Sequence, residues 1–88
     1  EVYGPYLNEE LLARALRGRR DRVVLASKFG MISHTGRNGL DSSPANVVTA
    51  LEGSLQRLQT DYIDLYYQHR LDRDTPIEDT VGALSELV

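Results

Sequence analysis

The sequence predicts an α/β fold: a partial (β/α)8 TIM barrel of about three βα units, with parallel strands and flanking helices. The spacing of apolar residues switches between a helical period and short continuous runs, as it does in alternating βα units. The run at residues 23–27 is almost wholly apolar, which is typical of a strand covered on both faces in a parallel sheet. Because a complete barrel needs about 250 residues, we expect residues 1–88 to be a fragment of a single barrel domain.

Two complete strands and a long loop are predicted. The strands cover residues 23–27 and residues 62–68, and a partial strand should end near Tyr3. Residues 29–42 hold three glycines and several polar residues, which indicates a loop at the tip of the first complete strand. Long loops in this position usually carry function.

A first helix is predicted over residues 9–17. The side chain of Asn8 can accept a hydrogen bond from a free backbone donor of the first turn. Gly18 can adopt the left-handed conformation in which helices often end. Apolar residues recur at a helical spacing, so one face of this helix should be buried. That face consists of Leu11, Leu12, Ala15 and Leu16.

Two further helices begin with recognisable signals. Ser43 is a capping residue and Pro44 is suited to the first helical position, so a helix should start there and end near Leu58. Thr75 and Glu78 have the spacing of a capping box, in which each side chain satisfies a free backbone donor. The expected buried stripes are Val47, Leu51, Leu55 and Leu58 in the second helix and Ile77, Val81, Leu84 and Val88 in the third.

The composition is that of an ordinary soluble domain. Apolar residues make up 41% and charged residues 26% of the chain, which argues against disorder. No apolar stretch approaches the roughly 20 residues that span a bilayer. A net charge of -3 offers nucleic acid no sustained attraction, and the absence of cysteine excludes disulfides and thiolate metal sites. We therefore expect a cytoplasmic protein without nucleic-acid or membrane partners.

Three polar side chains occupy the same kind of position in this scheme. Tyr3 lies at the end of the partial strand, Lys28 directly follows the apolar run at 23–27, and His69 follows the strand at 62–68. In a parallel barrel all strand tips point to one rim, and that rim carries the active site. The sequence therefore predicts that a phenol, an ammonium and an imidazole converge.

This trio suits the reduction of a carbonyl group. A free phenol is a poor acid at neutral pH because its pKa is about 10. A nearby ammonium stabilises the phenolate, and Lys28 is placed to do this for Tyr3. His69 can hold a carbonyl oxygen against the phenol through a hydrogen bond. The phenol would deliver a proton to the oxygen, but no side chain donates hydride, so a nicotinamide cofactor would be required.

The residues around these side chains resemble the aldo-keto reductase family. Glu1-Val2-Tyr3-Gly4 is similar to the second half of the family's Asp-Thr-Ala-Glu-x-Tyr-Gly motif. Leu25-Ala26-Ser27-Lys28-Phe29-Gly30 and residues 54–69 are similar to the stretches that hold the family's catalytic lysine and histidine. The segments follow the family's order and approximate spacing, and the resemblance covers essentially the whole chain.

The resemblance implies an NADPH-dependent oxidoreductase that reduces aldehydes or ketones to alcohols. Tyr3 would be the general acid, Lys28 its electrostatic partner and His69 the carbonyl-orienting group, with Tyr3 and His69 contacting the substrate. The family's catalytic aspartate would lie just ahead of Glu1, so the isolated fragment should be inactive. Two alternatives remain open: a non-catalytic binding or regulatory subunit of the same fold, and an inactive truncated fragment.

Two other groups of residues have simpler explanations than a functional site. A basic cluster could bind phosphate, but cations near a helix C-terminus complement its dipole, and this cluster should lie at the rim opposite the strand tips. The cluster consists of Arg17, Arg19, Arg20 and Arg22.

His34 has no second ligand at a recognisable spacing, so no metal site is predicted.

Overall fold

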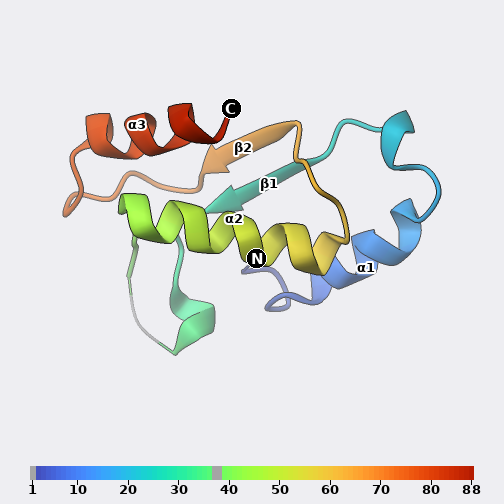
Figure 1. The fold of residues 1–88 in the computed structure, drawn as a ribbon. Helices are drawn as coiled ribbons and strands as arrows, with labels where there is room; N and C mark the ends of the chain where they lie inside the picture. The colour runs from blue at the N-terminus through green and yellow to red at the C-terminus, as the bar shows by residue number, and fades with distance from the viewer. Residues whose placement is uncertain (1, 37–38) are drawn as a thin grey trace.

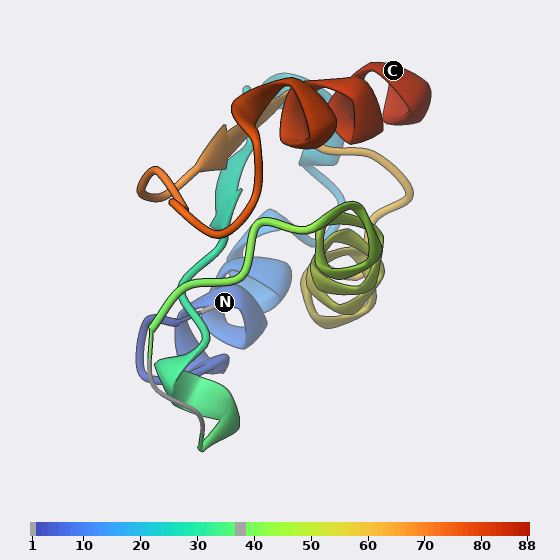
Figure 2. The same ribbon diagram turned by 90° about the vertical axis from the view of Figure 1, so that its left-hand side faces the viewer.

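The computed structural model describes residues 2–36 and 39–88. Figure 1 shows two short strands with helices packed beside them, and Figure 2 shows α2 and α3 on the same side of these strands. No helix within the described residues is long and apolar enough to cross a bilayer. The elements are α1 (Leu7–Leu16), β1 (Ala26–Phe29), α2 (Pro44–Leu58), β2 (Leu65–Gln68) and α3 (Ile77–Leu87), with 3-10 turns at Arg20–Arg22 and Ser33–Thr35.

The two strands are parallel neighbours, and their two faces differ. Ala26 lies opposite Leu65, and Lys28 lies opposite Tyr67. These four residues share one face because side chains alternate along a strand. The side chains of Leu65 and Tyr67 are exposed. In a closed barrel the face away from the helices points to the interior.

The other face of the strands packs against α2 and holds the core. The ring of Phe29 is almost completely buried and lies 5.0 Å from the ring of Tyr66. Apolar residues of α2 and α3 close over this pair, so the core lies between the sheet and two helices. The core consists of Phe29, Val47, Ala50 and Ala83, with Tyr66 and Leu84 packed against it.

Both strands are shorter than predicted. β1 begins at Ala26 rather than at residue 23, and β2 begins at Leu65 rather than at residue 62. Two-sided burial of the run at 23–27 was also a wrong expectation, because Val24 is 74% exposed. The backbone N–H of Leu25 donates to the carboxylate of Asp64 and not to a backbone group of the other strand. The paired residues therefore begin at Ala26, opposite Leu65.

Two consequences concern the predicted site residues. Because β1 runs on to Phe29, Lys28 lies inside the strand rather than just past its tip. The partial strand expected near Tyr3 is not formed, since residues 2–6 are turns. His69 directly follows β2, as predicted.

Helix α1 forms, but its cap and its buried face differ from the prediction. The helix begins at Leu7, so Asn8 lies in its first turn, and Tyr6 takes the cap position with φ 65° and no side-chain cap. Gly18 has φ +76° just after the helix, which confirms the predicted stop. Leu11 is 56% exposed, and the buried positions are Glu9 and Ala13. A charged residue is rarely buried without a partner, and Glu9 has one in Arg57 of α2.

Helix α2 matches the prediction in its cap and its bounds, but its buried positions are Val47, Ala50, Ser54 and Leu58, and the predicted Leu51 and Leu55 are half-buried. Ser43 is its cap, with its side chain accepting a hydrogen bond from the backbone N–H of Asn46, and Pro44 is the first helical residue. The helix ends at Leu58, and Gln59 then adopts the left-handed conformation with φ 55°. The start of α2 could be predicted from the sequence because the groups that cap it are neighbours in sequence.

Helix α3 forms where expected, but its capping box and its buried stripe were both predicted wrongly. Pro76 takes the cap position without a side-chain hydrogen bond, and the hydroxyl of Thr75 donates to Asp72 instead. The inward positions are Thr80 and Ala83, because the Thr80 hydroxyl donates to the backbone carbonyl of Ser42. Of the expected stripe, Leu84 is half-buried, while Ile77, Val81 and Val88 are exposed.

Candidate active site

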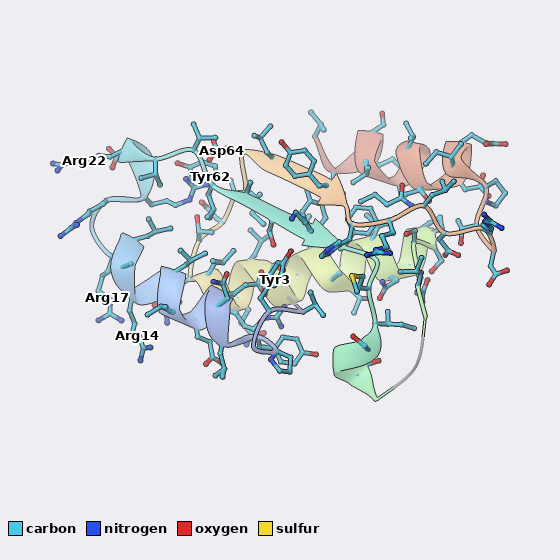
Figure 3. The ribbon with its side chains drawn as sticks, turned by 180° about the vertical axis from the view of Figure 1, so that it is seen from behind. Tyr3, Arg14, Arg17, Arg22, Tyr62 and Asp64 are labelled. Atoms are coloured by element: carbon cyan, nitrogen blue, oxygen red, sulfur yellow. The ribbon has the colours of Figure 1, made fainter. Side chains whose placement is uncertain are left out.

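Tyr3 is positioned by the turn that leads into α1. Its backbone carbonyl accepts a hydrogen bond from the N–H of Asn8, and Gly4 allows the turn because its φ is +83°. The Tyr3 side chain is 48% exposed and lies beside the strands in Figure 3. A turn anchored on the helix start therefore presents the phenol to the open face of the sheet.

Lys28 meets this phenol from β1. Its Nζ donates a hydrogen bond to the Tyr3 hydroxyl at 3.2 Å and lies 5.6 Å from the centre of the Tyr3 ring. Alternation along β1 places Lys28 on the open face while Phe29, the next residue, enters the core. The strand thus supplies one residue to the core and one to the site.

His69 also contacts the phenol, through its ring. Its backbone N–H donates to the carbonyl of Phe29 at 2.8 Å, which continues the strand pairing by one residue. Its ring centre is 5.9 Å from that of Tyr3, with a tilt of 38°. Burial, followed by the charges of Lys28 and Arg70, lowers the pKa of His69 below its ordinary value of 6.5. The imidazole is therefore mainly neutral at pH 7.

The structure thus brings together the three side chains that the sequence singled out. One contact is a direct hydrogen bond between Lys28 and Tyr3, and the other is a ring contact between Tyr3 and His69. The group combines a phenol that can give a proton, a lysine amine beside it and an imidazole that can donate a hydrogen bond. Such a set can protonate and orient one small polar group, such as a carbonyl oxygen.

A cavity of about 230 Å³ lies below this group, between α1 and the strands. Tyr3, Lys28 and Tyr67 are part of its wall, and Glu9 enters it from α1. The Glu9 carboxylate accepts hydrogen bonds from the Ser27 hydroxyl at 3.2 Å and from Arg57 at 2.9 Å.

Glu9 is a residue that sequence reasoning missed. Burial acts to raise its pKa, but the nearby Ser54 hydroxyl and the hydrogen bond and charge of Arg57 act to lower it, and the pKa of Glu9 lies below its ordinary value. The carboxylate therefore stays charged and links α1 to α2 and to the residue before Lys28. No local sequence pattern reveals this link, because Arg57 lies 48 positions further along the chain.

The predicted basic cluster lies at the opposite end of the strands, as expected. Figure 3 shows Arg22, Tyr62 and Asp64 at the end where β1 and β2 begin. Arg20 donates to the backbone carbonyl of Tyr62 at 2.7 Å and to the Asp64 carboxylate at 3.0 Å, and its guanidinium lies 3.8 Å from the centre of the Tyr62 ring. The role of Arg20 is structural.

Within the described residues, no three histidine, aspartate or glutamate side chains gather into a group that could hold a metal ion. The prediction for His34 concerned its side chain, which lies outside the described part of the structure.

Comparison with known proteins gives matches in sequence and in structure. The model of the aldo/keto reductase family matches residues 1–88. The curated protein "Probable aldo-keto reductase 1" of Glycine max is 44% identical over 90 residues, which cover 100% of this chain. Aldo-keto reductase AKR11C1 from Bacillus halodurans, solved in a holo form, superposes with a TM-score of 0.88 at 44% identity over 98% of this chain. An aldo/keto reductase from Klebsiella pneumoniae, solved in complex with NADP and acetate, gives a TM-score of 0.81 at 43% identity over 100% of this chain.

The chain is much shorter than these relatives. It spans 26% of the Glycine max protein, and it covers 30% of the Bacillus halodurans chain and 28% of the Klebsiella pneumoniae chain. Its parallel strands and their helices are therefore part of a (β/α)8 barrel, which confirms the predicted fold class.

Proposed function

Since the chain belongs to the aldo/keto reductase family, we propose that it is a segment of a single barrel domain that reduces aldehydes or ketones to alcohols with NADPH. The observation that carries the proposal is the hydrogen bond of 3.2 Å between Lys28 Nζ and the Tyr3 hydroxyl, with the centre of the His69 ring 5.9 Å from that of the Tyr3 ring. The likeness in sequence and structure to several aldo-keto reductases supports it.

In this proposal Tyr3 is the general acid. Its hydroxyl gives a proton to the carbonyl oxygen of the substrate, so a phenolate forms on the enzyme as the alcohol forms on the substrate. Lys28 stabilises that phenolate because its ammonium already lies within hydrogen-bond distance of the same oxygen. The positive charge therefore favours the state that follows proton transfer.

His69 orients the substrate. Because burial and nearby cations lower the pKa of His69, its ring is mainly neutral at pH 7 and can donate one N–H to the carbonyl oxygen. A donor at this place holds the oxygen beside the Tyr3 hydroxyl and stabilises negative charge that develops on it. The short backbone link to Phe29 fixes the origin of the His69 side chain.

A nicotinamide cofactor fits the chemistry of this donor set. The three side chains supply a proton and hydrogen bonds to a carbonyl oxygen, and they meet on the open face of the sheet. When bound, NADPH would supply the hydride that the reduction requires and that no side chain can give. The relative from Klebsiella pneumoniae was solved with NADP, which supports this choice.

The test is carbonyl-dependent oxidation of NADPH by the complete barrel protein, with Tyr3→Phe compared against wild type. Removal of the phenolic hydroxyl should lower kcat by about 10²–10⁴-fold because the general acid is lost. The matched control is Tyr62→Phe, the same change at the opposite end of the strands, which should keep wild-type kcat. Full activity of Tyr3→Phe would show that the phenol is not the acid.

We also propose that the 88 residues are inactive on their own. Tyr3 is 48% exposed in this chain, whereas electrostatic stabilisation of a transition state depends on a site that excludes water. Incubating the isolated chain with NADPH and a simple aldehyde should give no turnover above background. Clear turnover would contradict this part of the proposal.

A further inference from the structure

Ser42, the last residue of the loop that follows β1, is fully buried and bonded on three sides. Its backbone N–H donates to Asp72 Oδ2 at 2.9 Å, and its Oγ accepts from Gln68 Nε2 at 3.0 Å. Its carbonyl oxygen accepts from the Thr80 hydroxyl at 2.8 Å. Gln68 is the last residue of β2, Asp72 lies in the turn that follows β2, and Thr80 lies in α3. Ser42 therefore ties the loop after β1 to the chain on both sides of His69.

Asp72 holds the turn that follows His69. Besides the Ser42 N–H, its carboxylate accepts the backbone N–H of Asp74 at 3.0 Å and the hydroxyl of Thr75 at 3.1 Å. The bond from Ser42, followed by that from Asp74, lowers the pKa of Asp72 below its ordinary value. The side chain is therefore charged at neutral pH, and its hydrogen bonds are of the stronger, charge-assisted kind.

Gly30 shows how closely these segments approach. A Cβ on this residue would lie 3.1 Å from Ser42 Oγ and 3.9 Å from the backbone nitrogen of His69, and its φ of +109° is unsuited to other residues. The loop after β1 thus leaves and returns directly beside the end of β2. Any shift of Ser42 would be transmitted to the backbone at His69.

The alternation of side chains along β2 relates the contact between Ser42 and Gln68 to the position of the His69 ring. Gln68 and His69 are consecutive, so their side chains point to opposite faces when the strand pairing continues. The amide of Gln68 is fixed on Ser42, while the backbone N–H of His69 is fixed on Phe29. These two bonds restrain the end of the strand from which the His69 ring extends toward Tyr3.

We propose that Ser42, acting through the side-chain amide of Gln68, is a positioning residue for the His69 imidazole. It touches neither substrate nor cofactor, and it contributes by holding the ring where a carbonyl oxygen can accept its hydrogen bond. This inference rests on the proposed function for its catalytic consequence, and on the observed contacts for its structural part.

The first experiment is a double-mutant cycle on the complete barrel protein, with Ser42→Ala and His69→Gln separately and together. Ser42→Ala leaves the backbone bonds in place and removes only the acceptor of Gln68. It should lower kcat by about 10-fold to 100-fold, because small misplacements of a catalytic group have effects of that size. In the His69→Gln background the same change should lower kcat no further. An equal loss in both backgrounds would overturn the proposal.

A second measurement does not depend on activity. Titration of the His69 ring by nuclear magnetic resonance should show that Ser42→Ala raises the pKa of His69 toward its ordinary value. The ring would lose burial and move away from the charges of Lys28 and Arg70, which both lower the pKa now. An unchanged His69 titration would overturn the proposal, even if the protein reduced no carbonyl compound.

The control is Ser54→Ala, the same change at another fully buried serine, which lies beside Glu9 instead of Gln68. This variant should leave the His69 titration and the double-mutant coupling unchanged. A similar shift in both serine variants would indicate a general loosening and would overturn the specific role of Ser42. Absence of carbonyl reduction in the wild-type protein would instead refute the proposed function, while the titration would still decide the role of Ser42.

Discussion

The two ends of the β1–β2 pair use polar side chains in opposite ways. Where the strands begin, Arg20 and Asp64 direct their hydrogen bonds at backbone groups and at each other, which fastens the chain internally. Where the strands end, Lys28 and His69 both face the phenol of Tyr3, and the site they form opens away from the core. The comparison teaches that charge at one end is used for stability and at the other is available for chemistry, as is general in barrels.

At the beginning of the strands, Arg20 and Asp64 make further hydrogen bonds within the protein. The Arg20 guanidinium also donates to the hydroxyl of Thr60 at 3.1 Å and to the carbonyl of Val23 at 3.3 Å, so one side chain joins the approaches to both strands. The Asp64 carboxylate accepts the N–H of Leu25 at 2.8 Å. These bonds add to the backbone contacts at the start of the strands, where the carbonyl of Leu25 accepts the N–H groups of Asp64 and Leu65.

Among changes of charged residues at the two ends, the largest effect should come from Lys28. Lys28→Met in the complete barrel protein should lower kcat by about 10²–10³-fold, because the phenolate that follows proton transfer loses its cation. Steady-state kinetics with a simple aldehyde provide the measurement. Lys28→Arg, which keeps the charge on β1, should lose less. A wild-type kcat in Lys28→Met would contradict a chemical role for the charge at the end of the β1–β2 pair.

A smaller effect, on stability alone, should follow at the beginning of the strands. Arg20→Met should lower the free energy of unfolding by about 1–2 kcal/mol, since the backbone carbonyl of Tyr62 and the Thr60 hydroxyl lose their donor. Urea unfolding of the complete protein measures this, and kcat should not change. The exposed neighbour Arg22 provides the control Arg22→Met, with a change within about 0.5 kcal/mol. A fall in kcat for Arg20→Met would contradict the division of roles.

The same comparison explains what the sequence could and could not predict. The cap at Ser43 and the stop at Gly18 depend on near neighbours in sequence, and these signals were read correctly. Phe29 was assigned to the loop, but it ends β1 and is buried in the core. The placing of Lys28 and His69 on one edge follows from parallel pairing, which the alternating pattern predicted.

One error was local, because Thr75 was expected to cap α3 but donates to Asp72, only three positions earlier. Other errors arise where a polar side chain bonds to a distant segment. Thr80 turns inward because it bonds to Ser42, which lies 38 positions earlier, and Glu9 is buried beside Arg57, which lies 48 positions later. Single-sequence patterns describe neighbours at helical or strand spacing, so these long-range polar contacts had no signal. The support of the candidate site was therefore less predictable than its central residues.

The smallest expected effect concerns the pH dependence of stability. The hydrogen bond from the Leu25 N–H, aided by Arg20, lowers the pKa of Asp64 below its ordinary value of 3.8. A folded-state pKa below the unfolded one means that the unfolded chain binds more protons in acid. The stabilisation by the Asp64 carboxylate is therefore fully present above pH 3.8, and it is lost as the pH falls through the pKa of Asp64 in the folded protein.

Asp64→Asn should consequently reduce stability near neutral pH and reduce it progressively less as the pH falls below 3.8, when wild type loses the same charge. The effect should be modest because solvent and salt screen this carboxylate, and it should shrink further at high ionic strength. Urea unfolding over a pH series measures it, with the exposed Asp61→Asn as the control. A difference between wild type and Asp64→Asn that stays constant throughout the acid range would mean that the amide replaces the carboxylate by shape alone. The fastening at this end of the strands would then depend on hydrogen-bond geometry and not on charge, unlike the contact between Lys28 and Tyr3 at the other end.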